Sequence, residues 1–271
     1  MLESFEGCRQ RVERANAHHS TLAQAWNSFI ENRAYGFGLD INLDGTGAIW
    51  GWPTGSIPND FPLIVGEILY QYRSALDGAI YQAAIVESKQ DPPPNENDLM
   101  FPISSTRKKF ENASRYIAPL SEKCRAFIER VQPYNAPQVS ADLLVFNFNR
   151  SLGILNDWAR KDRHRRLHVV GSLASRADVM LIIPDTARLA SVEFVIKNEF
   201  LEGKTKIAAF TIEGHTPGMD VHANPNLPID IALDEIPPKC APNDTFGNRL
   251  EAISRTVKMI IGQIEQIILD K

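Results

Sequence analysis

The sequence has little cysteine, no long hydrophobic run and no secretion signal. Its three cysteines, Cys8, Cys124 and Cys240, are far apart and form no CxxC pair, which excludes a disulfide framework and a zinc knuckle. No stretch approaches the roughly 18 apolar residues of a membrane-spanning helix. The N-terminus has acidic residues where a signal peptide has basic ones. We therefore expect a cytoplasmic protein that makes no membrane contact.

The composition is that of an ordinary globular protein. Of the 271 residues, 44% are hydrophobic and 23% are charged, and 29 Lys and Arg against 33 Asp and Glu give a net charge of −4. This balance argues against a protein that binds polyanions over its whole surface, but it allows a local basic patch.

The first 170 residues carry mainly helical periodicity. Apolar residues recur at helical spacing in four segments, at about 8–29, 63–88, 106–131 and 141–168. The third should break near Ala118-Pro119, and Ser140 can cap the fourth. Residues 36–52 alternate around Asp44-Gly45, which predicts a β-hairpin.

The pattern changes after Gly171. Short β-rich runs occupy residues 192–200, 204–212 and 229–233, and a last helix is expected at about 245–269. We predict an α+β protein: residues 1–170 form a helical bundle with the hairpin inserted, and residues 171–271 form a small antiparallel sheet and an amphipathic C-terminal helix, all packed as one unit.

The C-terminal helix has a heptad-like apolar seam. Its members are Leu250, Ile253, Val257, Ile260, Ile264 and Ile267. The seam packs either on the protein's own bundle or sheet, or against a second copy in a homodimer.

A polar stripe follows the helix at 141–168. Asp157, Lys161, His164 and His168 lie within about 40° of one another on a helix of 100° per residue. One interpretation is a solvated helix face. The other is a catalytic group, with Asp157 near a histidine that moves a proton and Arg163 beside it.

The same helix ends in a basic run. Residues 160–166 contain five cationic residues and one acidic residue. These cations complement the negative end of the helix dipole, or they bind a phosphate-bearing ligand such as RNA, with Arg160, Asp162 and Arg165 as candidate binding residues.

Two more candidate binding residues lie on the helix at 63–88. Arg73 and Asp77 are spaced i, i+4 at the edge of its apolar stripe. They either form an ion pair that docks this helix on the helix at 141–168, or contribute to a polar site between the two.

No metal or cofactor is predicted. The segment Asp40–Gly45 resembles the start of an EF-hand loop, but Gly51 stands where a bidentate Glu is required. His215, Asp220 and His222 are a possible ligand set, although the intervening Pro217-Gly218 is a simple turn signal.

Four short motifs occur in a fixed order: the helix Leu63–Asp77 containing Arg73-Ser74-Ala75-Leu76-Asp77, then Phe101-Pro102-Ile103, Gln132-Pro133-Tyr134 and Asp162-Arg163-His164-Arg165. This order resembles a widespread group of uncharacterised bacterial proteins, whose usual wording is GDxxHNLRSALDH, FPI, QPY and NxxDKHR. The chain departs from that wording at Glu67, Tyr70, Gln71 and Gly78, where the group has Asp, His, Asn and His. The resemblance implies that polar residues gather around Arg73, Asp77, Asp162, His164 and Arg165.

A more distant resemblance is to HEPN domains, helical bundles of toxin and defence systems. Their ribonuclease members carry an Arg and a His four to six residues apart, a spacing that Arg163 and His168 share, as do Arg14 and His19. Two hypotheses follow. The first is a noncatalytic binding protein that uses the basic end of the helix at 141–168 for an anionic ligand or partner. The second is a metal-independent endoribonuclease in which His164 or His168 moves the proton of a ribose hydroxyl.

Overall fold

The computed structural model describes residues 5–32, 34–136, 148–164, 167, 169–173, 178–194, 201, 203–226, 229–233 and 245–270. It contains helices and antiparallel strands, so the mixed α+β class is confirmed. The chain divides into two compact units. A helical unit comprises residues 1–22, 62–167 and 247–271, and a β unit comprises residues 23–61 and 168–246.

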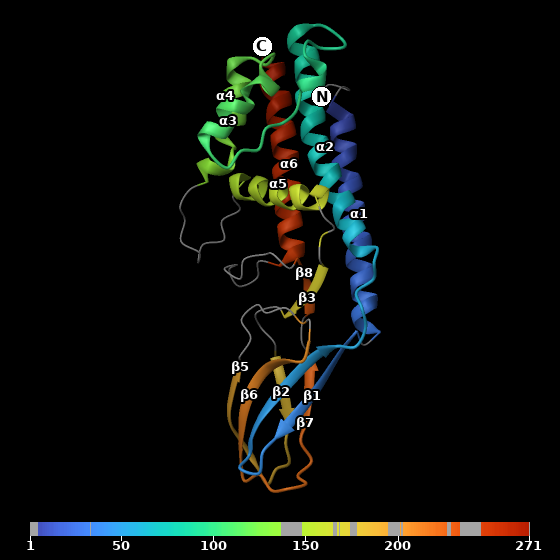
Figure 1. The fold of residues 1–271 in the computed structure, drawn as a ribbon, viewed down its shortest axis with the longest axis vertical. Helices are drawn as coiled ribbons and strands as arrows, with labels where there is room; N and C mark the ends of the chain where they lie inside the picture. Colours follow the sequence, from blue (N-terminus) through green and yellow to red (C-terminus); the bar gives the residue numbers. More distant parts are fainter. Residues whose placement is uncertain are drawn as a thin grey trace. The chain divides into compact units, whose positions relative to one another are not determined.

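Three long helices form the frame of the helical unit (Figure 1): α1 (Glu6–Glu31), α2 (Phe61–Ser88) and α6 (Phe246–Leu269). Asn16 on α1 links all three, because its Oδ1 accepts hydrogen bonds from Tyr72 Oη at 2.9 Å and Ser254 Oγ at 2.8 Å. The helix expected at 63–88 is confirmed as α2. It ends before Lys89, which has a left-handed φ of 57°, and before three prolines that cannot continue a helix.

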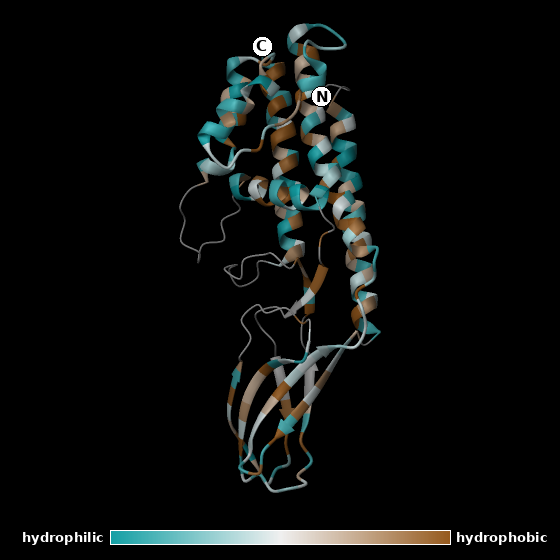
Figure 2. Cartoon of the chain, viewed as in Figure 1, coloured by the Kyte–Doolittle hydropathy of each residue, from teal (hydrophilic) through white to brown (hydrophobic). Residues whose placement is uncertain are grey.

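The seam of α6 lies inside the chain. None of its six apolar residues is more than 8% exposed, and Figure 2 shows brown, hydrophobic turns recurring along α6. The helix therefore packs on the protein's own bundle. Of the two alternatives for the seam, packing within the chain is the one that the structure shows, and a side chain buried within one chain is not available to a second.

The remaining helices of this unit are shorter. The expected break near Ala118-Pro119 is confirmed, since α3 (Arg107–Ala113) and a 3-10 turn (Ser114–Ile117) precede α4 (Glu122–Arg130). Helix α5 (Phe148–His164) lies across the long helices (Figure 1). The expected cap Ser140, together with Arg165, Arg166 and His168, lies outside the described residues.

The β unit contains a four-stranded antiparallel sheet in the order β1-β2-β6-β5 (Figure 1): β1 (Tyr35–Ile41), β2 (Thr46–Pro53), β5 (Arg188–Phe194) and β6 (Thr205–Glu213). The hairpin β1–β2 is confirmed. Gly45 takes the positive φ of 81° that its turn requires, and Asp44 Oδ1 accepts a hydrogen bond from the Thr46 backbone N at 3.0 Å.

The sequence led us to expect the hairpin within the helical bundle, and this expectation is wrong. Strand β2 pairs with β6, with Thr46 opposite Thr211 and Ala48 opposite Ala209. This pairing satisfies the free edge of β2 and buries Ile49 against the apolar face of β6. We expected the two parts of the chain to meet at residue 170, but the two compact units have other boundaries. The hairpin belongs to the β unit and α6 to the helical unit.

Two strand pairs complete the described part of the β unit. Strand β3 (Val169–Leu173) pairs with β8 (Ile229–Leu233), and β4 (Asp178–Ile182) pairs with β7 (His222–Asn226). Leu181, Val221 and Ala223 pack on the core formed by residues such as Ile49 and Phe210. One face of the four-stranded sheet is therefore covered by the β4–β7 region.

Candidate functional site

Arg73 and Asp77 form a clamp, because the side chains of both bind the backbone of one residue, Phe101. Arg73 Nη2 donates to Phe101 O at 3.2 Å, and the Phe101 backbone N donates to Asp77 Oδ1 at 2.9 Å, while the two side chains lie 3.5 Å apart. Phe101 is fully buried. The predicted ion pair is thus present, but its hydrogen bonds dock the segment around Phe101 on α2 rather than α2 on α5.

Burial acts on the two charges of this clamp in opposite directions. Desolvation lowers the pKa of the Arg73 guanidinium and raises the pKa of the Asp77 carboxyl, and each partner's charge opposes the shift of the other. Arg163 on α5 is near enough that its charge further lowers the pKa of Arg73. The end of α5 thus lies close to the clamp.

Gln132 also binds the segment around Phe101, through its side-chain amide. Its Nε2 donates to Pro102 O and Ile128 O, both at 2.9 Å, and its Oε1 accepts from the Ser104 backbone N at 2.8 Å. The Gln132 side chain is fully buried. The FPI and QPY motifs therefore meet in space, and their polar groups bind each other. Their role in this chain is structural.

The described catalytic candidates on α5 face solvent. Asp157, Arg163 and His164 are exposed, and His168 lies outside the described residues. Asp157 and His164 are seven residues apart, which is about 10 Å along the helix axis. A carboxylate at that distance does not orient the imidazole. Within the described part of the stripe, Asp157 and His164 thus lie on an exposed helix face, while Lys161 between them is partly buried.

Asp162 differs from its neighbours because it points toward α2. A Cβ at Gly66 would lie 2.7 Å from Asp162 Oδ2, so the Asp162 carboxylate occupies the space that a side chain at residue 66 would need. Asp162 forms no hydrogen bond or ion pair with any described residue. Burial raises the pKa of its carboxyl.

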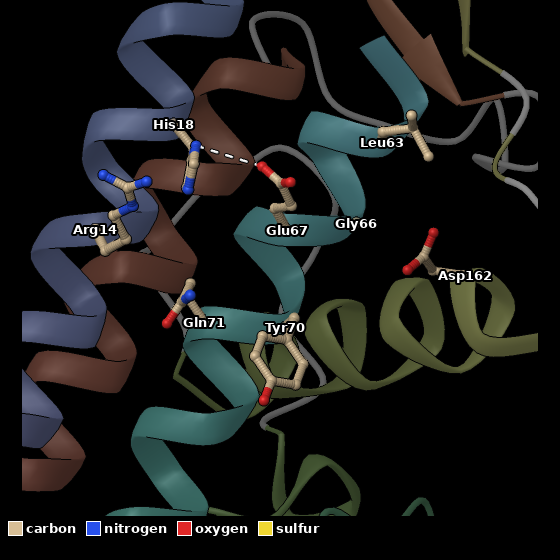
Figure 3. A pocket seen from close by; sticks show the side chains of 8 residues that line it. All are labelled: Arg14, His18, Leu63, Gly66, Glu67, Tyr70, Gln71 and Asp162. Atoms are coloured by element: carbon tan, nitrogen blue, oxygen red, sulfur yellow. Dashed lines mark ion pairs between the residues drawn. The ribbon is translucent and has the colours of Figure 1, made fainter. Parts of the chain in front are cut away.

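Asp162 and Gly66 border an open hollow of about 540 Å³ (Figure 3). The hollow lies over α2, between α1 and α5. It is lined by Arg14, His18, Leu63, Gly66, Glu67, Tyr70, Gln71 and Asp162.

The far side of the hollow is formed by α1 and the adjoining face of α2. His18 Nδ1 lies 3.5 Å from Glu67 Oε2 and links the two helices, as the dashed line in Figure 3 shows. Arg14 is exposed and has no ion pair within the described ranges. Leu63 and Tyr70 are each 61% exposed. The hollow thus combines two carboxylates, two basic side chains and two exposed apolar groups.

Sequence reasoning identified only Asp162 among these lining residues. Arg14 was noted for its spacing to His19 alone. The available signal was Gly66, because a glycine inside a strong helix often marks a close approach. Glu67, Tyr70 and Gln71 are positions at which the chain departs from the wording of the resembled group.

The described cysteines are not activated, and the described residues that commonly bind metals do not cluster. Burial raises the pKa of Cys8 and of Cys124 to about 11, so both remain protonated near neutral pH. No three His, Cys, Asp or Glu side chains among the described residues gather as metal ligands. Asp220 Oδ1 and His222 Nε2 lie 2.8 Å apart, as an exposed pair.

Comparisons with protein-family models, curated proteins and solved structures found no match to this chain. No helix in the described part of the chain is long and apolar enough to span a bilayer.

Proposed function

We propose that this is a noncatalytic cytoplasmic binding protein that holds a phosphate-bearing ligand at the basic end of α5. The observation that carries the proposal is the state of Arg160 and Arg163. Both are exposed, and neither has a hydrogen bond or ion pair within the described residues. A guanidinium presents several donors in a fixed fork that matches phosphate oxygens.

Three other surface arginines of this chain are paired with a carboxylate. Arg107 pairs with Glu111, Arg188 with Glu213 and Arg255 with Glu251. Arg160 and Arg163 lack such partners within the described residues, as Arg14 and Arg125 do, and they are set apart by standing three residues apart at one helix end. An incoming phosphate would therefore not have to displace an internal carboxylate from either of them.

The spacing of these groups allows one ligand to contact several of them. Arg160 and Arg163 are i, i+3 neighbours, and His164 is i+4 from Arg160, so all three share one side of the helix end. Arg163 also repels Arg73, whose Nη1 is buried with no hydrogen-bond partner in the described structure. Arg163 also attracts the Asp77 carboxylate, whose pKa its charge lowers. An anion bound at Arg163 would therefore relieve the repulsion from Arg73 and oppose the attraction to Asp77.

The helix dipole gives a purely structural reason for cations at this end of α5. That effect needs no ligand and predicts no affinity, so binding measurements separate the two explanations. We would titrate the protein into a short end-labelled single-stranded RNA in EDTA and analyse the samples on native gels at several salt concentrations.

We expect a salt-sensitive shift. Two exposed contacts of about 0.7 kcal/mol each give a roughly tenfold loss of affinity in Arg160→Ala/Arg163→Ala. The slope of log affinity against log salt should fall by about 1.4. The control Arg107→Ala/Arg125→Ala removes two exposed charges from α3 and α4 and should leave the affinity within about twofold.

An absent shift, or an equal loss in the control, would contradict the proposal. The same samples on a denaturing gel test the ribonuclease hypothesis. RNA cleavage that His164→Ala abolishes would identify a metal-independent nuclease in place of a binding protein.

A further inference from the structure

The β unit has a sheet face that the helical site does not use. Side chains alternate along each strand, so Asp40 on β1, Trp50 on β2, Lys206 on β6 and Glu193 on β5 all lie on the face opposite the apolar core. Glu193 is exposed, and Trp50 and Lys206 are partly exposed. This open face borders a hollow of about 470 Å³, within the size range of small-molecule sites.

Aromatic surface is concentrated on this face. Trp52 shares the face with Trp50. Its ring lies over the glycines of β1: a Cβ at Gly36 would be 2.5 Å from Trp52 Nε1, and a Cβ at Gly38 would be 3.0 Å from Trp52 Cη2. The floor beside Trp50 is made by small side chains such as Ala48 and Ala209. The result is a flat apolar platform with an indole at one end.

The border of the platform is polar. It consists of Asp40, Asn42, Thr46, Glu193, Lys206 and Thr211. Carboxylate and amide oxygens accept hydrogen bonds, and Lys206 and the Thr211 hydroxyl donate them, whereas the Thr46 hydroxyl already donates to Asp44 Oδ1. Trp50 Nε1 is also a donor, and it is shielded from solvent without a hydrogen-bond partner in the part of the chain that the structure describes.

We propose that the open face of the β1-β2-β6-β5 sheet binds a carbohydrate. The apolar face of a sugar ring would stack on Trp50, and the ring hydroxyls would exchange hydrogen bonds with the polar border. Such a ligand needs an aromatic surface and a mixture of donors and acceptors, and this face supplies both.

Charge favours a neutral sugar over a nucleic acid. Asp40 and Glu193 oppose Lys204 and Lys206, so the charges on and beside the border cancel, whereas a groove for single strands is positively charged. Lys204 Nζ lies 4.9 Å from the Trp50 ring centroid and 3.6 Å from Asp40 Oδ2, and its side chain is 59% exposed. This exposed lysine covers the indole, and an incoming ring can displace it.

Affinity gel electrophoresis of the full chain tests this proposal. Native gels would contain hydroxyethyl cellulose, xylan, glucomannan or glycol chitin. We expect retardation by at least one of the four, weakened tenfold or more by Trp50→Ala and about threefold by Asp40→Asn/Glu193→Gln. The control Glu122→Gln removes an exposed acid on α4, and its retardation relative to a gel without polysaccharide should equal that of the wild type.

The second variant protects the test against misfolding, because Asp40 and Glu193 are exposed and their replacements are isosteric. No retardation by any of the four polysaccharides would overturn the proposal. So would retardation that both sheet variants leave unchanged. A shift of oligo-dT that Trp50→Ala abolishes, with no polysaccharide binding, would instead identify a nucleic-acid surface. None of these outcomes depends on Arg160 or Arg163.

Discussion

Replacing Gln132 should destabilise the helical unit strongly. Its amide makes three hydrogen bonds to backbone groups, at Ser104 N, Pro102 O and Ile128 O. Gln132→Leu keeps similar volume but leaves these buried groups without the side-chain partner, at about 1 to 3 kcal/mol each. Because water can reach some of them after relaxation, we expect a loss of about 3 to 5 kcal/mol. Typical total stabilities are about 5 to 15 kcal/mol.

Urea unfolding measured by circular dichroism gives the free energy of unfolding for wild type and variant. Gln263 is exposed on α6, so Gln263→Leu is a matched control and should change the stability by less than about 0.5 kcal/mol. Gln132→Glu adds a sharper test. It keeps the acceptor for Ser104 N but places a carboxylate oxygen against two carbonyl oxygens, so its stability should recover partly at acidic pH. A loss below about 1 kcal/mol in Gln132→Leu would refute the idea that this side chain holds the FPI segment.

Two further predictions concern Asp162 and α6. Burial raises the pKa of Asp162 above its ordinary value of 3.8, so the charged form costs stability at neutral pH and the cost fades as the pH falls through the raised pKa. Asp162→Asn should therefore raise the Tm at pH 7, and the gain should shrink toward pH 4. A constant gain across this range would contradict the assignment. Ile260→Ala should lower the free energy of unfolding by about 2 to 5 kcal/mol. It should leave the molar mass from light scattering unchanged, whereas a fall in mass would return the seam to a dimer interface.

The helices could be predicted because their apolar periodicity is long and uninterrupted. The residues that bury α2 and α6 recur over many turns, and prolines at 92–94 mark where α2 must end. Strands β3, β4 and β7 were missed, whereas the equally short β8 was expected at 229–233, and β7 contains Pro225. Their pairings come from tertiary contacts that no local pattern encodes. The same reason explains why the partner of the hairpin, β6, was not expected.

The candidate site divides in the same way. Arg73 and Asp77 were recognisable as a pair from i, i+4 spacing alone. Their partner Phe101 could not be recognised in this way. Arg73 and Asp77 bind its backbone N and O, which every residue other than proline has, so the residue type at position 101 does not indicate the contact. His18 and Glu67 lie on different helices and come together only when α1 packs beside α2.

The resemblance to the uncharacterised bacterial group stays a prediction, but its motif positions divide by structural role in this chain. Arg73 and Asp77 bind Phe101 of the FPI motif, and Gln132 of the QPY motif binds Pro102. These matching residues fix one loop on the helical unit. Three of the departing positions, at 67, 70 and 71, line the hollow beside Asp162. The side chains that line this hollow therefore differ from the group's usual wording at these three positions, whereas the residues that bind the Phe101 segment agree with it.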